Sequence, residues 1–168
     1  LFLQAAPGVR HSGEGLNQLV YRSLEIKKQM VERDEFDRGP RNVFNYGHSF
    51  GHALESSCNY RLPHGISVSY GIDLANMVAV HLGMLDAGTR NRIRAGCQIV
   101  FDGFPCPEID IGVYYEALKR DKKNSGGQLG LILLSKIGFA AKTMVDFNDE
   151  IKTLIGAFFE NKMYLREI

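Results

Sequence analysis

Histidine is concentrated in one stretch of this 168-residue chain, which holds three of its five histidines at His48, His52 and His64. His48 and His52 are four residues apart, so on a helix their imidazoles project from one face and can approach a single ion. His64 follows Pro63, where a turn can bring it back as another ligand. Because a catalytic zinc ion takes about three protein ligands and keeps one position open, the stretch predicts a metal site.

The alternative is that these histidines are partly buried and only form hydrogen bonds with their neighbours. The glycines beside them bear on this choice, since Gly47, Gly51 and Gly65 each adjoin a histidine. Glycine lowers helix stability by about 1 kcal/mol relative to alanine, yet its missing side chain lets a backbone or a ligand approach closely. The glycines therefore favour a site.

Lys27 is a further candidate, because it interrupts the apolar stripe of an amphipathic segment. At about 100° per residue, Leu24, Lys27 and Val31 point into one narrow arc. The pattern predicts that the Lys27 ammonium faces the buried side, where lysine needs a partner. That partner is either an anionic ligand or a neighbouring carboxylate, Asp34 or Glu35.

These residues need elements that position them, and helical periodicity dominates the chain. Gly39-Pro40 should break the first helix, and the apolar, small-residue run over 64–85 should be a central helix. Two short apolar runs around Ser135-Lys136 indicate one β-hairpin. The sequence predicts a mainly α, multi-helical domain with helices over 14–36, 45–58, 64–85, 88–101, 111–120 and 148–164, and strands over 128–134 and 137–143.

Composition limits the function classes. The net charge is +1, from 20 basic and 19 acidic residues without a basic stripe, which argues against nucleic acid and charged membrane surfaces. No apolar run approaches the roughly 20 residues of a membrane helix. The odd, scattered Cys58, Cys97 and Cys106 fit neither a disulfide framework nor a cysteine zinc site, so we expect a reducing cytoplasm. The first residue is Leu1 rather than Met, which suggests a fragment of a longer protein.

A longer motif surrounds the histidines. The pattern Arg41-x3-Asn45-x-Gly47-His48-x2-Gly51-His52-Ala53-x-Glu55, followed by His64-Gly65, resembles the signature of 3-dehydroquinate synthases and related sugar-phosphate cyclases. The resemblance extends upstream through Ile26-Lys27 and downstream through Arg120-Asp121-Lys122-Lys123. It covers nearly the whole chain from Leu16 onward.

The resemblance implies the C-terminal half of a two-domain fold. In that family an N-terminal α/β domain binds NAD, and the helical domain, here residues 1–168, supplies metal and substrate ligands across a cleft. Zinc, or cobalt, is held by two histidines that match His48 and His64 and by a glutamate upstream of Leu16 that is not found here. The resemblance also implies a homodimer and an NAD-binding domain absent from this chain.

The same resemblance assigns substrate contacts. His52 matches a histidine that faces the substrate phosphate and is not a metal ligand, and Asn45 and one lysine of the pair Lys122-Lys123 match other phosphate contacts. Without the resemblance, the lysine pair would be read as a solvated loop. The substrate in this family is a small-molecule sugar phosphate.

Lys27 and Arg41 match the residues that hold a substrate carboxylate. Two buried cations need an anion between them, since desolvation of either alone costs several kcal/mol. The pair therefore favours 3-deoxy-arabino-heptulosonate 7-phosphate, and Lys27, Arg41, Asn45 and His52 are the expected catalytic set.

The implied reaction is a phosphate-eliminating lyase reaction of the shikimate pathway. NAD oxidises an alcohol polarised by zinc, phosphate leaves, the ketone is reduced, and ring opening precedes aldol closure to 3-dehydroquinate. This chain alone is predicted to be inactive, because it holds two metal ligands and no nucleotide domain.

Three alternatives remain open. Ile66 stands after His64-Gly65 where the family usually has a glutamate, which leaves room for another cyclase of the 2-deoxy-scyllo-inosose or valiolone synthase type. A metal-dependent polyol dehydrogenase domain would resemble this architecture, but has no use for Lys27, Arg41, Asn45 and the lysine pair together. A non-catalytic helical interaction domain would fold without metal and gain nothing from zinc or substrate.

Overall fold

The structure is a computed structural model that describes residues 13–37, 39–121, 124 and 126–160. The chain forms two compact units, residues 1–44 and 45–168, which are described one at a time. Among the described helices, none combines the length and apolar content that a membrane span requires. The mainly helical fold with one hairpin is as predicted.

The first unit contains helix α2, Gly13–Arg33, and most of the 3-10 helix η1, Pro40–Asn45. Helix α2 ends at Arg33, three residues before the predicted residue 36, because the Asp34 side chain binds the backbone of the segment that follows. The Asp34 carboxylate accepts hydrogen bonds from the backbone N–H groups of Gly39, at 2.8 Å, and Arg41, at 3.1 Å.

The prediction that Lys27 faces a buried side was wrong. Leu24 is 61% exposed and Lys27 is exposed as well. In the described part of this unit, η1 is the one other element, and it is too short to cover the apolar stripe of a 21-residue helix.

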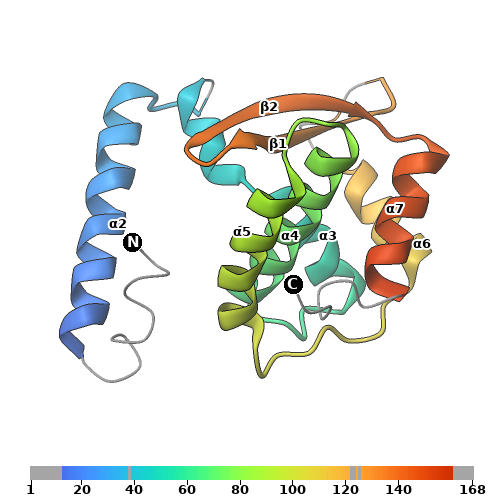
Figure 1. Ribbon diagram of the computed structural model, residues 1–168, viewed down its shortest axis with the longest axis horizontal. Coiled ribbons are helices and arrows are strands. Elements are labelled where there is room, and N and C mark those ends of the chain that lie inside the picture. The colour runs from blue at the N-terminus through green and yellow to red at the C-terminus, as the bar shows by residue number, and fades with distance from the viewer. Residues whose placement is uncertain (1–12, 38, 122–123, 125, 161–168) are drawn as a thin grey trace. The chain divides into compact units, whose positions relative to one another are not determined.

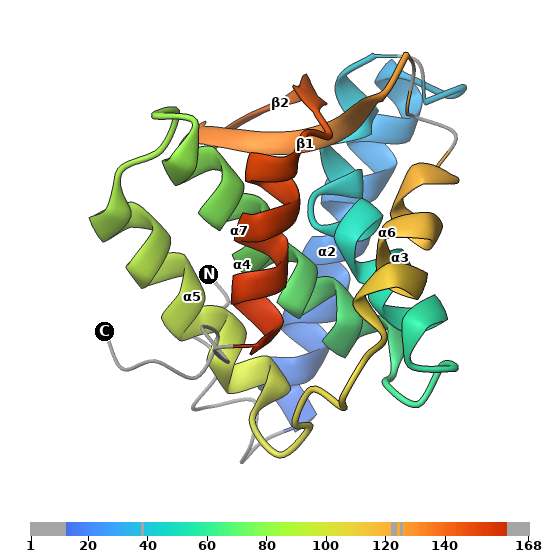
Figure 2. The ribbon, with the colours of Figure 1, turned by 90° about the vertical axis from the view of Figure 1, so that its right-hand side faces the viewer.

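The second unit is built around helix α4, His64–His81, as predicted for the central helix. Helix α4 contacts α3, α5, α7 and strand β1, and Figure 2 shows it behind α7, with α5 and α3 on either side. It ends before the predicted residue 85, because Gly83 has a φ of +68° that a helix does not allow. The other elements are α3 His48–Ser57, α5 Ala87–Phe101, α6 Ile111–Lys119, β1 Gln128–Lys136, β2 Phe139–Asp146 and α7 Asp149–Glu160.

Glycines bring the backbones of α3 and α4 together. A Cβ atom on Gly51 would lie 2.9 Å from Val68 Cα, and one on Gly71 would lie 2.1 Å from the Gly47 carbonyl oxygen. The predicted close approach at Gly47 and Gly51 is therefore a helix–helix contact. Gly65 differs, since a Cβ there meets nothing within 4 Å.

The hairpin crosses one end of the helices of the second unit (Figure 1). Its strands are antiparallel, with Leu129 opposite Val145, and β1 is buried from Leu129 to Leu134. The turn lies at Ile137-Gly138 instead of the predicted Ser135-Lys136. Gly138 has a φ of +85°, which suits the two-residue loops that close hairpins.

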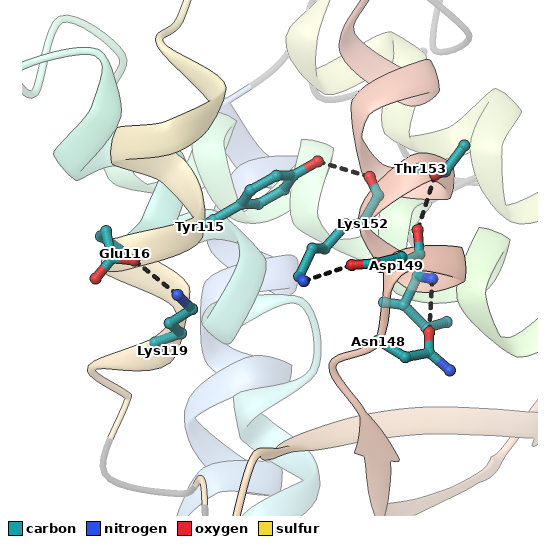
Figure 3. Close-up of polar contacts among 8 residues, drawn as sticks. Tyr115, Glu116, Lys119, Asn148, Asp149, Lys152 and Thr153 are labelled. Carbon is teal, nitrogen blue, oxygen red and sulfur yellow. Dashed lines mark hydrogen bonds and ion pairs between the residues drawn. The ribbon is translucent and has the colours of Figure 1, made fainter.

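Polar contacts connect α6 to α7, as Figure 3 shows. The Tyr115 hydroxyl donates to the Lys152 carbonyl oxygen at 2.6 Å. The Asn148 side chain caps α7 by accepting from the Ile151 N–H at 3.0 Å. Helix α7 begins one residue after its predicted start and is described to Glu160, so the predicted continuation to residue 164 lies outside the described residues.

Candidate metal centre

Three imidazoles meet where α4 begins against α3: His48 is the first residue of α3, His52 lies one turn later, and His64 is the first residue of α4. The ring centroids of His48 and His52 are 5.5 Å apart, those of His48 and His64 5.4 Å, and those of His52 and His64 5.6 Å. With zinc–nitrogen bonds of about 2.0 Å and tetrahedral angles, two imidazoles on one zinc ion have centroids about 5 Å apart. The cluster therefore has the spacing that a metal ion requires.

The segment between α3 and α4 reverses the chain direction and places His64 next to His48 and His52. Helix α3 starts at His48, directly after Gly47, whose φ of +76° only glycine adopts easily. At the other end, Asn59 and Tyr60 have φ values of +52° and +56°, and the Tyr60 N–H donates to the Glu55 carbonyl oxygen at 2.8 Å. This reversal places the first residue of α4 beside the last turn of α3.

Two of the three imidazoles have an acceptor at Nδ1. The His48 Nδ1 atom lies 3.2 Å from the Tyr46 carbonyl oxygen, and the His64 Nδ1 atom lies 3.0 Å from Glu55 Oε1. Both oxygens accept in these contacts, so each Nδ1 is assigned the hydrogen and each Nε2 keeps a lone pair for a ligand bond. The ring nitrogens of His52 have no hydrogen-bond partner within the described part of the chain.

The metal centre also includes Glu55, a residue for which the sequence predicted no role. It is 8% exposed, and the ligand atoms of His52, Glu55 and His64 all lie within 4.8 Å of one another. The available signal was its position three residues after His52, which on a helix places both side chains on one face.

The predicted carboxylate-binding residues belong to the first unit. The Arg41 Nη1 atom donates to the Glu35 carbonyl oxygen at 2.7 Å. Lys27 has no ion-pair partner within the described residues, so the alternative pairing with Asp34 or Glu35 is not formed there. The role of Lys27 and Arg41 toward a carboxylate stays a prediction.

The predicted phosphate contacts are only partly described. Asn45 ends η1 and is half-buried, three residues before His48. Lys122 and Lys123 lie outside the described residues. Ile66, the departure from the family pattern, belongs to the hydrophobic core of the second unit.

A buried polar cluster lies next to the α3–α4 contact and was missed in the sequence. Asp73 is fully buried, with Arg90 Nη2 at 3.1 Å from Oδ1 and Arg94 Nε at 3.7 Å from Oδ2. Burial raises the pKa of the Asp73 carboxyl, and the two arginines oppose that rise. The signal was an aspartate inside the apolar run, with two arginines four residues apart on the next helix.

Tyr46 connects the buried Asn76 of α4 to the metal centre. Its hydroxyl donates to Asn76 Oδ1 at 2.5 Å, while its carbonyl oxygen contacts the His48 ring. Burial raises the pKa of the Tyr46 hydroxyl, so it stays protonated and can donate this bond at any physiological pH.

Comparison with known proteins finds the same family by a family model and by individual sequences. The model of the family described as 3-dehydroquinate synthase C-terminal matches residues 4–124. The 3-dehydroquinate synthase of Campylobacter concisus is 35% identical over 144 residues, which are 84% of this chain and 41% of that protein. The 3-dehydroquinate synthase of Clostridium perfringens is 36% identical over 137 residues, 80% of this chain and 39% of that protein. The chain thus spans about two fifths of the length of these curated relatives.

Solved structures share the fold. A 2-deoxy-scyllo-inosose synthase complexed with carbaglucose-6-phosphate, NAD+ and Co2+ has a TM-score of 0.64 at 23% identity, over 75% of this chain and 36% of that one. The 2-epi-5-epi-valiolone synthase ValA from Streptomyces hygroscopicus, with NAD+ and Zn2+ bound, has a TM-score of 0.71 at 20% identity, over 90% of this chain and 42% of that one.

Proposed function

The chain belongs to the 3-dehydroquinate synthase C-terminal family, and we propose that it is the metal- and substrate-binding part of a zinc- and NAD-dependent cyclase. The proposed reaction converts 3-deoxy-arabino-heptulosonate 7-phosphate to 3-dehydroquinate and releases phosphate. NAD and a third metal ligand would come from an N-terminal domain, and the working protein would be a homodimer. In the proposed setting the enzyme is cytoplasmic.

The arrangement of the three imidazoles carries this proposal. Metal-bound histidines almost always donate their second ring N–H to a carboxylate or a carbonyl oxygen. His48 and His64 each have such an acceptor at Nδ1, and these are the two residues that match the family's metal ligands. His52, which matches the phosphate-facing histidine, has none within the described residues. The spacing and the acceptors therefore support a two-histidine contribution to a metal centre.

A bound zinc or cobalt ion would supply Lewis acidity toward an alcohol oxygen of the substrate. His48 and His64 would hold it through Nε2. The imidazole of His52 and the amide of Asn45 would donate hydrogen bonds to phosphate oxygens, and Lys122 or Lys123 would add a positive charge. These groups would stabilise the negative charge that grows on phosphate as it leaves.

Substrate choice would depend on Lys27 and Arg41. A guanidinium matches the planar geometry of a carboxylate, and an ammonium adds a point charge beside it. Cyclases that act on sugar phosphates without a carboxylate have no use for this pair, and neither has a simple polyol dehydrogenase. Both cations therefore support a carboxylate-bearing substrate.

A second candidate is a cyclase for a sugar phosphate without a carboxylate. The observation that favours it is Ile66, a core residue at the position after His64-Gly65 where a polar side chain is usual in the family. Such an enzyme would act on glucose 6-phosphate or sedoheptulose 7-phosphate by the same sequence of oxidation, elimination and ring closure.

The deciding experiment measures phosphate release by the full-length protein that contains this chain, with NAD and zinc. Three substrates are compared: 3-deoxy-arabino-heptulosonate 7-phosphate, glucose 6-phosphate and sedoheptulose 7-phosphate. We expect release from the first alone, and we expect Arg41→Ala to abolish it. Release from either of the others, with none from the first, would retain the cyclase mechanism and overturn the proposed carboxylate role of Lys27 and Arg41.

A further inference from the structure

We propose that Glu55 is a positioning residue that holds His64 in the one tautomer able to bind metal through Nε2, and that it is not itself a metal ligand. This inference rests on the proposed metal centre and deepens it. The carboxylate of Glu55 lies 3.0 Å from His64 Nδ1. It would fix both the position of the ring hydrogen and the direction in which the ring presents its other nitrogen.

Burial gives the contact its strength. The Glu55 side chain is 11% exposed, whereas that of His64 is 57% exposed. A buried carboxylate needs a donor to offset its lost hydration, and the His64 Nδ1–H is such a donor. More than half of the His64 side chain remains exposed, so an ion and a substrate can reach it.

The position of Glu55 also suits a negative charge. His64 is the first residue of α4, and the capping residue Pro63 offers no side-chain acceptor to the first N–H groups of that helix. Helix N-termini favour nearby anions, because their free N–H groups carry partial positive charge. Glu55 is the acidic residue beside this helix start.

The backbone reversal between the helices is tied to the same residue. Its carbonyl oxygen accepts from the Tyr60 N–H at 2.8 Å, while its carboxylate contacts His64. Asn59 and Tyr60 both have left-handed φ values, which asparagine adopts readily but which are strained for a bulky residue such as Tyr60 and persist there only where the surroundings hold them. Glu55 therefore anchors the segment that delivers His64.

Geometry separates this role from that of a ligand. The two nitrogens of an imidazole point to opposite edges of the ring, so an ion bound at Nε2 is separated by the ring from an acceptor at Nδ1. With the side chains as they lie, Glu55 could share an ion with His64 only if the ion replaced the hydrogen at Nδ1. That rival arrangement would use His52, since the ligand atoms of His52, Glu55 and His64 lie within 4.8 Å of one another.

The chain offers a matched control pair. His81 Nε2 lies 3.1 Å from Glu150 Oε1, with the Glu150 side chain 68% exposed. His81 ends the helix that His64 begins, and a helix of that length separates the two residues by about 25 Å. Glu150→Ala removes a histidine–glutamate contact without touching the centre.

The experiment compares Glu55→Ala, Glu55→Gln and Glu150→Ala in the full-length protein. Zinc affinity is measured by competition with a chelating dye, and the tautomer of each histidine is read from 15N shifts of the metal-free protein. We expect Glu55→Ala to weaken zinc binding by about 10- to 100-fold and to leave His64 as a mixture of tautomers. Glu55→Gln, whose amide oxygen still accepts the N–H, should keep the tautomer and lose less affinity. Glu150→Ala should change the His81 shifts alone.

Two results would overturn the proposal. One is an unchanged His64 tautomer and unchanged zinc affinity in Glu55→Ala. The other is loss of zinc binding in Glu55→Gln as complete as in Glu55→Ala while the metal-free tautomer is retained, because this would make Glu55 a ligand. If Glu55→Ala does not fold, the nearly isosteric Glu55→Gln carries the test. A held His64 tautomer in a wild-type protein that binds no zinc would support the Glu55 contact and contradict the proposed metal centre.

Discussion

At the residue scale, the three imidazoles are nearly equidistant, and the groups that hold them distinguish their roles. A main-chain carbonyl holds His48, a buried carboxylate holds His64, and His52 has no hydrogen-bond partner within the described residues. The Tyr46 carbonyl is itself held in place, since the hydroxyl of the same residue is bonded to the fully buried Asn76. The position of the His48 acceptor is thus linked to the Tyr46–Asn76 hydrogen bond behind it.

Tyr46→Phe tests that dependence. Loss of the hydroxyl leaves the Asn76 oxygen buried without its donor, which costs about 1–3 kcal/mol. The free energy of unfolding in urea should fall by that amount. Tyr21→Phe is the control, because Tyr21 is 71% exposed on α2 and its change should leave stability within experimental error. Equal stability of the two variants would contradict a structural role for the Tyr46 hydroxyl.

The sequence could predict that the histidines gather, because His48 and His52 share a helix face and His64 follows a proline. It could not predict the Nδ1 acceptors. Those depend on the left-handed residues at 59 and 60 and on a glycine before α3, which set where Glu55 and the Tyr46 carbonyl lie. Spacing alone would have paired His48 with His52 as ligands.

At the element scale, α3 and α4 form one supporting unit whose backbones touch through glycine. The periodicity of the sequence predicted both helices, and their starts and ends differ because backbone conformation at Gly47 and Gly83 sets them. The predicted hairpin turn at Ser135-Lys136 was wrong for a similar reason. Gly138 has a positive φ and closes the loop, so the glycine sets the turn position and the polar Ser-Lys pair does not.

Gly71→Ala should separate the two helices. Its new Cβ would lie 2.1 Å from the Gly47 carbonyl oxygen, and overpacking of this kind costs about 1–3 kcal/mol or more. Thermal unfolding should occur at a lower temperature, with weaker zinc binding. Gly65→Ala on the same helix is the control for stability, since a Cβ there meets nothing within 4 Å and alanine favours a helix. A Gly71→Ala protein as stable as wild type would contradict the tight contact.

At the scale of the whole molecule, the motif around the histidines predicted the family correctly, and the family model matches residues 4–124, a span of 121 of the 168 residues. The first helix was predicted correctly in position, whereas the face predicted to be buried is exposed. An apolar stripe indicates that a helix face can be covered, but it does not say which segment covers it. The described residues of the first unit include no segment that covers the stripe of α2, and Lys27 is therefore exposed.

The reactivity of the three cysteines, all in the second unit, measures whether that unit is tightly packed. Burial raises the pKa of both Cys97 and Cys106 to about 12, and Cys58 is fully buried. Since the thiolate is the reactive form, a raised pKa leaves almost none of it at pH 8, and reactivity should grow only toward pH 12. Mass spectrometry after iodoacetamide treatment at pH 8 should show no modified cysteine in the native protein and three in urea. Rapid alkylation of the native protein would contradict the packing.

The 168-residue chain by itself should release no phosphate from 3-deoxy-arabino-heptulosonate 7-phosphate, even with NAD and zinc. Two proposed metal ligands without a nucleotide domain cannot complete an oxidation and reduction cycle. Turnover by a preparation whose mass matches this chain, and which persists through gel filtration, would refute that expectation. The full-length protein is the positive control.

Zinc binding by single-histidine variants of the full-length protein tests the central claim most directly. Wild type, His48→Ala, His52→Ala and His64→Ala are compared by chelator competition. We predict that the His48 and His64 variants lose more than about 100-fold in affinity, beyond what loss of an outer contact costs, and that His52→Ala binds zinc nearly as well as wild type. Loss of zinc from His52→Ala with retention in His48→Ala would contradict the assignment of ligands and of the phosphate-facing imidazole.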